Sequence, residues 1–397
     1  MTQAPPTSRT ADQTATIGFL FNHDQIHQIG HSLPIALAMA EHEPSVEVVV
    51  ATTSRRLADE VARLSLGRPA AARIRFVELE LKSAGSRLAA RLLDWLLPAA
   101  KLAVYRDNLD FFRSLDVLLV TEKTSLLLKT RYRLTGLRMA HTRHGAGDRA
   151  IGFDPASAGF DQVLVSGPKV RDRLIAEAGV APGSIDMVGY PKFDWISDGP
   201  ALPFASSARP TILYNPHSSP HLSSWYKDGR RVLDWFLGHP EFNLIFAPHV
   251  MLFERPFTLT IDRLRVERSG RIARKYHEAP NILIDLGSSA STDMSYTNAA
   301  DLYLGDASSQ VYEFLFRPRP CIFLNSHHVD HHGDPNFAHW RAGEVIGDVA
   351  ELGRAIDRAL ANPDRYRAAQ GALFEQSFDL TDELSARRAA RAIVARL

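Results

Sequence analysis

The sequence has only one cysteine and no long uninterrupted apolar run. A single cysteine, Cys321, excludes an intramolecular disulfide and a cysteine-rich zinc site. It lies in the apolar run 320–324, which indicates a buried strand residue. No stretch reaches the roughly 18 consecutive apolar residues that a membrane-spanning helix needs. Residues 1–15 lack the apolar core of a signal peptide, so we expect a disordered tail on a cytoplasmic protein.

An excess of charge of one sign is also missing. The 46 Lys and Arg residues against 45 Asp and Glu residues give a net charge of +1. A general nucleic-acid-binding protein would carry a strong basic excess, so we expect no nucleic-acid partner. With 45% hydrophobic and 23% charged residues the composition is that of a globular protein, and 397 residues suggest two domains.

Two nucleotide-binding motifs are absent as well. The first predicted strand, 17–22, is not followed by a Gly-x-Gly-x-x-Gly turn, and the sequence contains no Walker loop. These absences argue against a dinucleotide-dependent dehydrogenase and against a P-loop nucleoside triphosphatase.

Short apolar runs alternate with amphipathic segments along the chain. Runs rich in Val, Ile and Leu, separated by helical segments, are typical of a parallel sheet with helices on both faces. In the first part we expect strands at 17–22, 46–51, 74–79, 116–120, 138–141, 162–165 and 185–188. In the second part we expect strands at 212–215, 244–247, 282–285, 302–304 and 321–324.

The predicted fold class is therefore α/β, with two doubly wound Rossmann-like domains facing a central cleft. We expect a first domain over 16–197, a linker over 198–210 that holds three prolines, and a second domain over 211–380. A C-terminal helix over 381–397 is expected to pack against the second sheet. In such folds ligands bind outside the carboxyl ends of the strands.

The strongest local signal follows the strand at 302–304. Asp306, Ser308 and Ser309 form a turn of small polar residues that leads directly into a helix. The unpaired amides of a first helical turn, with serine hydroxyls beside them, suit a phosphate or pyrophosphate. Glu313 follows Ser309 by one turn and is expected to accept hydrogen bonds from ribose hydroxyls. The alternative is an ordinary helix N-cap.

A second signal is the segment 142–149, which contains His144 between polar and glycine residues at a strand end. Gly145 and Gly147 would allow a substrate to approach the backbone closely. Histidine is the side chain best suited to take a proton from a hydroxyl near neutral pH. We expect His144 to be a general base and Asp148 to contact the acceptor; the alternative is a turn shaped only by its glycines.

Other histidines also follow predicted strands. His217 and His249 come after the first two strands of the second domain, and we expect them beside the phosphates. His23 and His27 follow the first strand of the chain and are expected on the acceptor side. The histidine cluster at 327–332 lies on a loop without fixed ligand geometry, so we expect no metal site.

The order of these motifs resembles the CDP-glycerol glycerophosphotransferase family of teichoic-acid synthesis, which has a GT-B architecture. The resemblance covers about 137–325, and its matching pieces are the His144-Gly145 turn, the segment 188–194, the strand exits at 214–216 and His249, and the Asp306-Ala-Ser308-Ser309 turn. It implies that His144 and His249 are catalytic and that Asp306, Ser308 and Ser309 hold the pyrophosphate of the donor. The first domain would then bind the acceptor and the second domain the nucleotide.

Three positions depart from the family pattern. Ala307 replaces a tyrosine, His249 follows its proline instead of preceding it, and 217–219 replaces a threonine–tryptophan–arginine type of strand exit. These departures affect the inference about which donor is used more than the inference about the fold. A nucleotide-sugar glycosyltransferase and a UDP-N-acetylglucosamine 2-epimerase therefore stay open. The epimerase would need carboxylates deep in the cleft, for which Asp148 and Glu122 are the candidates.

The activity that the resemblance implies is transfer of glycerol phosphate from CDP-glycerol to an acceptor hydroxyl, without a metal or another cofactor. His144 would remove the proton of the acceptor hydroxyl, the oxygen would attack the distal phosphorus, and CMP would leave. A lipid-linked or polymer acceptor of the cell envelope is implied by the family in the same way.

The segment 86–113 interleaves Leu, Trp and Tyr with Arg and Lys. Helical spacing gathers Leu88, Leu92, Trp95 and Leu96 on one stripe. This pattern is typical of an interfacial helix, and it predicts peripheral contact with the cytoplasmic face of the inner membrane. The alternative is a stripe that faces the core of the protein.

Overall fold

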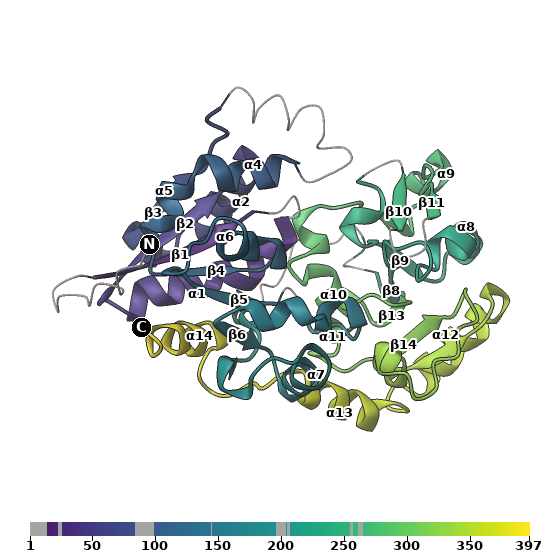
Figure 1. Cartoon of the computed structure of the whole chain (residues 1–397). Coiled ribbons are helices and arrows are strands. Elements are labelled where there is room, and N and C mark those ends of the chain that lie inside the picture. The colour runs from purple at the N-terminus through teal and green to yellow at the C-terminus, as the bar shows by residue number, and fades with distance from the viewer. Residues whose placement is uncertain are drawn as a thin grey trace. The chain divides into compact units, whose positions relative to one another are not determined.

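The computed structural model describes residues 14–22, 26–83, 99–143, 145–195, 204, 207–254, 257–260 and 265–397. Its contacts divide the chain into two compact units (Figure 1). Unit 1 draws its described residues from Met1–His144, Phe153–Trp195 and Phe378–Leu397, and unit 2 from Gly145–Gly152 and Ile196–Ser377. Most of the predicted tail and linker lie outside the described residues.

Unit 1 is built on a parallel sheet of seven strands in the order β3-β2-β1-β4-β5-β6-β7. The strands are β1 (Ala15–Phe21), β2 (Val46–Thr52), β3 (Ile74–Glu78), β4 (Val117–Val120), β5 (Arg138–Thr142), β6 (Gln162–Val165) and β7 (Ile185–Met187). They match the seven predicted strands. The winding direction reverses between β1 and β4, which makes this pair the topological switch point of the sheet.

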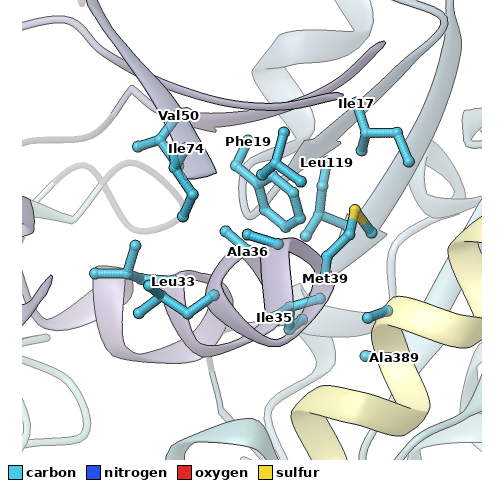
Figure 2. Close-up of a cluster of buried hydrophobic side chains, with 14 of the residues drawn as sticks. Ile17, Phe19, Leu33, Ile35, Ala36, Met39, Val50, Ile74, Leu119 and Ala389 are labelled. Atoms are coloured by element: carbon cyan, nitrogen blue, oxygen red, sulfur yellow. The ribbon is translucent and has the colours of Figure 1, made fainter. Parts of the chain in front are cut away.

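The central strands β1 and β4 of this sheet are apolar and buried on both faces. Ile17, Phe19 and Phe21 of β1 point into one hydrophobic cluster, whereas Leu20 points into a second cluster. The helices of the unit are α1 (Ile29–His42), α2 (Arg55–Ser65), α4 (Ala99–Asp107), α5 (Leu109–Arg113), α6 (Leu127–Thr130), α7 (Pro168–Ala178) and α14 (Ser385–Val394). Figure 2 shows the first cluster, in which the apolar side of α1 packs under β1, β2 and β4.

The C-terminal helix α14 belongs to unit 1, so the prediction that it packs against the second sheet is wrong. Its small buried residues Ala389 and Ala390 pack in the first cluster, and α14 lies beside α1 (Figure 1). Figure 2 shows Ala389 in that cluster. The hydroxyl of Ser385 accepts a hydrogen bond of 2.9 Å from the N–H of Tyr190. A β-carbon at Gly189 would lie 2.4 Å from that hydroxyl, so this close approach needs glycine.

The described part of the segment 86–113 packs on the core of unit 1. Val104, Tyr105 and Phe112 of α4 and α5 are buried in the second hydrophobic cluster. The stripe at 88–96 lies outside the described residues, so membrane contact stays a prediction for that part. No helix among the described residues has the length and apolar character needed to cross a bilayer.

Unit 2 is built on a parallel sheet of six strands in the order β12-β9-β8-β13-β14-β15. They are β8 (Thr211–Asn215), β9 (Asn243–Phe246), β12 (Ile282–Ile284), β13 (Leu302–Gly305), β14 (Cys321–Leu324) and β15 (Glu344–Ile346). A two-stranded antiparallel sheet of β10 (Thr258–Thr260) and β11 (Arg265–Glu267) accompanies it. The α/β prediction with two doubly wound sheets is confirmed, although β15 and the small sheet were not predicted.

Helices flank this second sheet, and its four central strands β9, β8, β13 and β14 are fully buried. The helices are η8 (Trp225–Gly229), α8 (Arg230–Gly238), α9 (Arg274–His277), α10 (Ser295–Ala299), α11 (Gln310–Phe314), α12 (Leu352–Ala361) and α13 (Arg367–Ser377). Cys321 is buried in β14 as predicted, and burial raises the pKa of its thiol. The winding reverses between β8 and β13, which is therefore the switch point of unit 2.

Candidate functional site

The switch point of unit 2 brings two predicted motifs together. Asn215, the last residue of β8, is the register partner of Gly305, the last residue of β13. The segments that follow these strands begin with Pro216 and Asp306 and therefore leave the sheet side by side. In parallel sheets this position is where ligands bind, because the two chains diverge and open a crevice.

Asp306 is fully buried and connects the two segments. One carboxylate oxygen, Oδ1, accepts hydrogen bonds from the backbone N–H groups of His217 (2.9 Å) and Ala307 (2.6 Å). The other, Oδ2, accepts from the N–H (2.6 Å) and the hydroxyl (2.8 Å) of Ser224. Burial raises the pKa of Asp306, and these donors oppose that shift. Asp306 thus holds the two segments together through four hydrogen bonds.

Ser308 and Ser309, which were predicted as a pair, have different surroundings. Ser308 is buried, and its hydroxyl donates to Oδ1 of Asn215 at 2.5 Å. Ser309 is exposed at the N-terminus of α11, and its side chain makes no capping hydrogen bond. Ser309 is therefore the exposed member of the pair, while Ser308 joins the ends of β13 and β8.

Glu313, predicted to hold ribose, lies in α11 with 7% of its surface exposed. Its position one turn after Ser309 is as expected from the sequence. Contact with a ribose stays a prediction.

The glycine turn at 145–147 lies against Ser309. A β-carbon at Gly147 would lie 2.8 Å from Cβ of Ser309, and one at Gly145 would lie 3.5 Å from its hydroxyl. Gly145 also has a φ of +149°, which favours glycine. Within unit 2, these glycines therefore allow the turn to approach the segment that was predicted to bind phosphate.

Asp148 is buried in unit 2, and its contact with an acceptor stays a prediction. Its Oδ2 accepts from the hydroxyl of Tyr312 (2.6 Å) and from the backbone N–H of His339 (3.1 Å), and lies 2.9 Å from Nδ1 of His339. The other ring nitrogen of His339, Nε2, lies 2.9 Å from the carbonyl oxygen of Asp306. His339 therefore connects the 145–149 segment to the switch point.

Basic side chains gather where the segments after β8 and β9 meet. Nη1 of Arg149 lies 3.0 Å from Nε2 of His217. The ring centroids of His217 and His249 lie 5.4 Å apart. Nδ1 of His249 accepts from the N–H of Met251 at 3.3 Å, so a neutral His249 carries its proton on Nε2 as a donor.

The pKa of His217 is well below its ordinary value. Burial is the main cause, and the charge of Arg149 and the neighbouring histidines adds to it. His217 is therefore neutral at physiological pH, and the Arg149 guanidinium faces a neutral ring. The guanidinium of Arg149 and the Nε2–H group of His249 are donors that favour an anionic ligand such as a phosphate.

Several predicted residues lie outside the described part of the structure. They are His144, the candidate base, and His23; the side chain of His27 in the short helix η1 (Ile26–Gln28) is also not described. Glu122 follows β4 in unit 1, where its Oε2 accepts from the hydroxyl of Thr124 at 3.2 Å. His327 contacts the carbonyl oxygen of Ser223 at 3.0 Å, and no group of His, Cys, Asp or Glu among the described residues could hold a metal ion.

Two residues of this site were not predicted from the sequence. His339 lies in the 3-10 helix η11 (Pro335–Ala342), far from any predicted strand end, so no local signal distinguished it. Arg149 stood in the predicted segment next to Asp148, and only the fold shows that it reaches His217.

No family model and no curated protein matches this chain. Several solved structures, in contrast, are similar to this chain. The wall teichoic acid polymerase TagF, in a crystal soaked with CDPG, is 11% identical over 97% of this chain and 89% of its own, with a TM-score of 0.61. The UDP-GlcNAc 2-epimerase of Methanocaldococcus jannaschii, in complex with UDP-GlcNAc and UDP, is 13% identical over 96% and 99%, with a TM-score of 0.59.

A third similar structure is the glycotransferase of kitacinnamycin, which is 13% identical over 97% of this chain and 100% of its own, with a TM-score of 0.56. The three proteins have different activities and cover nearly the whole chain. At these identities the likeness establishes the fold, which is of the GT-B type.

Proposed function

We propose that this chain is an enzyme that uses a nucleoside diphosphate-activated donor, and that it transfers glycerol phosphate from CDP-glycerol to an acceptor hydroxyl. The observation that carries this proposal is the arrangement at the β8/β13 switch point. The rings of His217 and His249 lie side by side there, Ser309 begins the helix that follows β13, and the buried Asp306 accepts hydrogen bonds from four donors. A crevice with this chemistry suits a diphosphate.

In this proposal the donor phosphates lie between the segments after β8, β9 and β13. Nε2–H of His249 and the hydroxyl of Ser309 donate to phosphate oxygens, and negative charge that develops on the leaving phosphate is stabilised by them. Groups of this kind, fixed before the reaction begins, typically lower the barrier by about 3 kcal/mol each. Glu313 would hold the ribose.

The reaction would proceed by direct displacement at the distal phosphorus. The acceptor oxygen forms a bond to that phosphorus, the bond from phosphorus to the oxygen of the CMP phosphate breaks, and His144 takes the acceptor proton. No bound metal is needed if the basic side chains balance the phosphate charge. A chelator such as EDTA should therefore leave turnover unchanged.

The motif order supports CDP-glycerol, because the His144-Gly145 turn and the Asp306-Ala-Ser308-Ser309 turn resemble the glycerophosphotransferase family. A nucleotide-sugar glycosyltransferase is the second candidate, since the same phosphate site would serve a sugar donor. A 2-epimerase is a third candidate, since a UDP-GlcNAc 2-epimerase is among the similar solved structures. Of its two candidate carboxylates, Asp148 contacts His339 and Tyr312.

The test is thermal stabilisation against a panel of CDP-glycerol, CMP, UDP and UDP-N-acetylglucosamine, followed by donor turnover with and without acceptor. We expect the largest rise in melting temperature with CDP-glycerol, and donor consumption only when an acceptor is present. A preference for UDP-sugars would move the assignment to a glycosyltransferase. Interconversion of a UDP-sugar without acceptor would identify an epimerase.

The acceptor is proposed to be a lipid-linked or polymer hydroxyl at the cytoplasmic face of the membrane. Support comes from the family resemblance and from the apolar stripe at 88–96. Sedimentation with anionic vesicles at low and high salt tests it, with a Trp95→Glu, Leu96→Glu variant for comparison. A wild-type protein that stays in the supernatant at low salt would contradict membrane contact.

A further inference from the structure

A pocket of about 600 Å³ lies in unit 1, between α2 and the strands β2 and β3. Nine of the twelve residues that line it are apolar or glycine, and none of them belongs to the motifs of the candidate site. A volume of this size is typical of pockets for small ligands. We propose that the pocket binds the hydrocarbon chain of a single-chain amphiphile, whose anionic head group is held at one end by Ser65 and Arg68. This ligand is distinct from the donor and the acceptor of the proposed function.

The pocket exists because α2 lines it with small side chains. Ala58, Ala62 and Ser65 follow one another at positions i, i+4 and i+7, so they lie on one face of the helix. On the sheet, the register partners Val50 and Phe76 line the same pocket. Side chains as short as alanine and serine leave space beside the strands, and Phe76 keeps 46% of its surface exposed. An apolar ligand would remove this surface from water, which stabilises the complex.

The pocket is elongated along the helix. Ala58 and Ser65 both line it, and α2 rises by about 10 Å between them. Because α2 connects two neighbouring parallel strands, it runs back along them. Thr52 and Glu78, the last residues of β2 and β3, therefore line one end, and Leu66 lines the other. Leu66 is 84% exposed, which gives this second end an apolar rim. An extended hydrocarbon chain fits this shape, whereas a protein partner needs a broad face.

Ser65 contributes a hydroxyl group without a partner to this lining. The residue is 7% exposed, and its Oγ has no hydrogen-bond partner among the residues that the structure describes. A buried hydroxyl that stays unpaired lowers stability, so native proteins rarely leave one in that state. An oxygen of the ligand that accepts from Ser65 would satisfy it. The ligand is therefore apolar along most of its length and carries an oxygen at this end.

Arg68 supplies a positive charge at the same end. Its Nε donates to the carbonyl oxygen of Leu64 at 3.1 Å, which places it beside the end of α2 that carries Ser65. Its guanidinium lies 3.9 Å from the centre of the Trp195 ring. At the opposite end the pocket is lined by Glu78, which would repel an anion. The two ends thus differ in charge, and a carboxylate or phosphate head group fits the end with Arg68.

The experiment measures binding by calorimetry below the critical micelle concentration and without nucleotide. The probes are saturated fatty acids of increasing chain length, alkyl phosphates of the same lengths and the matching primary alcohols. We expect each added methylene to tighten binding about fourfold until the chain fills the pocket, and no gain beyond that length. The alcohols should bind more weakly than the acids, because they lack the charge that pairs with Arg68. Binding of either acid supports the proposal, and the tighter of the two identifies the head group.

A variant that fills the pocket tests where the chain lies. Ala62→Leu adds three carbon atoms to the pocket wall, so the affinity should level off at a chain about three methylenes shorter. Its melting temperature should not fall, because an added apolar side chain in a hollow commonly stabilises a protein. The matched control is Ala176→Leu, which changes an exposed alanine of α7 outside the pocket and should bind as the wild type does.

Two further variants test the head group. Arg68→Gln should weaken binding of the acids by about 10-fold or more and leave the alcohols unchanged. Its control is Arg55→Gln in the same helix, because Arg55 pairs with Asp59 at 3.0 Å and does not line the pocket. Ser65→Ala should weaken binding of the acids by about 3- to 10-fold and raise the melting temperature, because a buried hydroxyl without a partner is removed.

Absence of binding at every chain length would overturn the proposal. So would an affinity that rises without levelling off in both the wild type and Ala62→Leu, because that is adsorption to the surface. Binding that appears only in the Trp95→Glu, Leu96→Glu variant would assign the pocket to the stripe at 88–96 of the same chain. A dimer in sedimentation that Ala62→Leu dissociates would assign it to a second copy. Either assignment would replace the amphiphile as the occupant. Because no nucleotide is present, none of these results bears on the proposed function.

Discussion

The hydroxyl of Ser308 lies 2.5 Å from the side-chain oxygen of Asn215, and this hydrogen bond joins the ends of β13 and β8. The same oxygen of Asn215 accepts from the hydroxyl of Tyr303 at 3.2 Å, and its amide nitrogen donates to the carbonyl of Ala247 at 2.6 Å. Asn215 thus holds the carboxyl ends of three neighbouring strands together. Ser308 belongs to this support, whereas Ser309 is exposed.

This difference predicts that single replacements of the two serines separate stability from binding. Ser308→Ala should lower the free energy of unfolding by about 1 kcal/mol, because a buried hydrogen bond is lost. Ser309→Ala should leave stability unchanged and weaken binding of a nucleoside diphosphate by roughly 3- to 10-fold. Denaturant unfolding and calorimetry measure the two effects.

The bare nucleoside is the control for both variants. If Ser309 contacts phosphate, nucleoside binding stays at the wild-type level in Ser309→Ala and in the double variant Ser308→Ala, Ser309→Ala. Equal losses for nucleoside and nucleoside diphosphate would show that the segment only caps α11.

Replacement of His144 tests the proposed base. His144→Ala should lower turnover by roughly 10²- to 10⁴-fold, because the acceptor hydroxyl loses the group that removes its proton. Donor affinity, measured by calorimetry without acceptor, should stay nearly the same. More than half of the wild-type turnover in this variant would remove His144 from the mechanism.

Gly147 is predicted to be sensitive to the addition of a single carbon. In Gly147→Ala the new β-carbon would lie 2.8 Å from Cβ of Ser309, so the turn or the helix start must move. We expect weaker binding of the diphosphate with a small loss of stability. The control is Gly371→Ala in α13, where a β-carbon meets nothing within 4 Å and where alanine favours the helix. Similar behaviour of both variants would contradict a role for this close approach.

The strands could be predicted because the residues that form them are continuous Val, Ile and Leu runs. Such runs are apolar on both faces, and only a doubly covered parallel sheet buries both. The three-residue strand β15 begins with Glu344 and has no such run, so it was missed. The place of α14 could not be predicted from its pattern, because a stripe of alanines shows that a helix is buried but not which partner buries it.

The candidate site was predictable only where its residues follow strands. His217, His249, Asp306 and Ser308 stand at strand exits, and the sheet order alone brings these exits together. His339 has no comparable position in the sequence. Its importance comes from contacts with Asp148 and Asp306, which are 191 and 33 positions away along the chain.

The low pKa of His217 predicts a specific dependence of stability on pH. In the unfolded chain His217 takes up a proton near its ordinary pKa of 6.5, whereas burial delays this uptake in the folded chain to lower pH. Between these two values the unfolded state binds more protons, so the free energy of unfolding falls as the pH falls through 6.5. His217→Gln lacks this contribution and should lose less stability than the wild type between pH 7 and pH 5, to an extent of about 1 kcal/mol for each pKa unit of the shift.

The measurement is denaturant unfolding at several pH values, taken as the difference between variant and wild type so that the other titrating groups cancel. His277→Gln, which changes an exposed histidine of α9, is the matched control for the loss of a histidine side chain. A His217→Gln variant with the same slope as the wild type would mean that His217 is protonated equally in the two states. The ring that Arg149 contacts would then become a cation as the pH falls through 6.5, as it does in the unfolded chain.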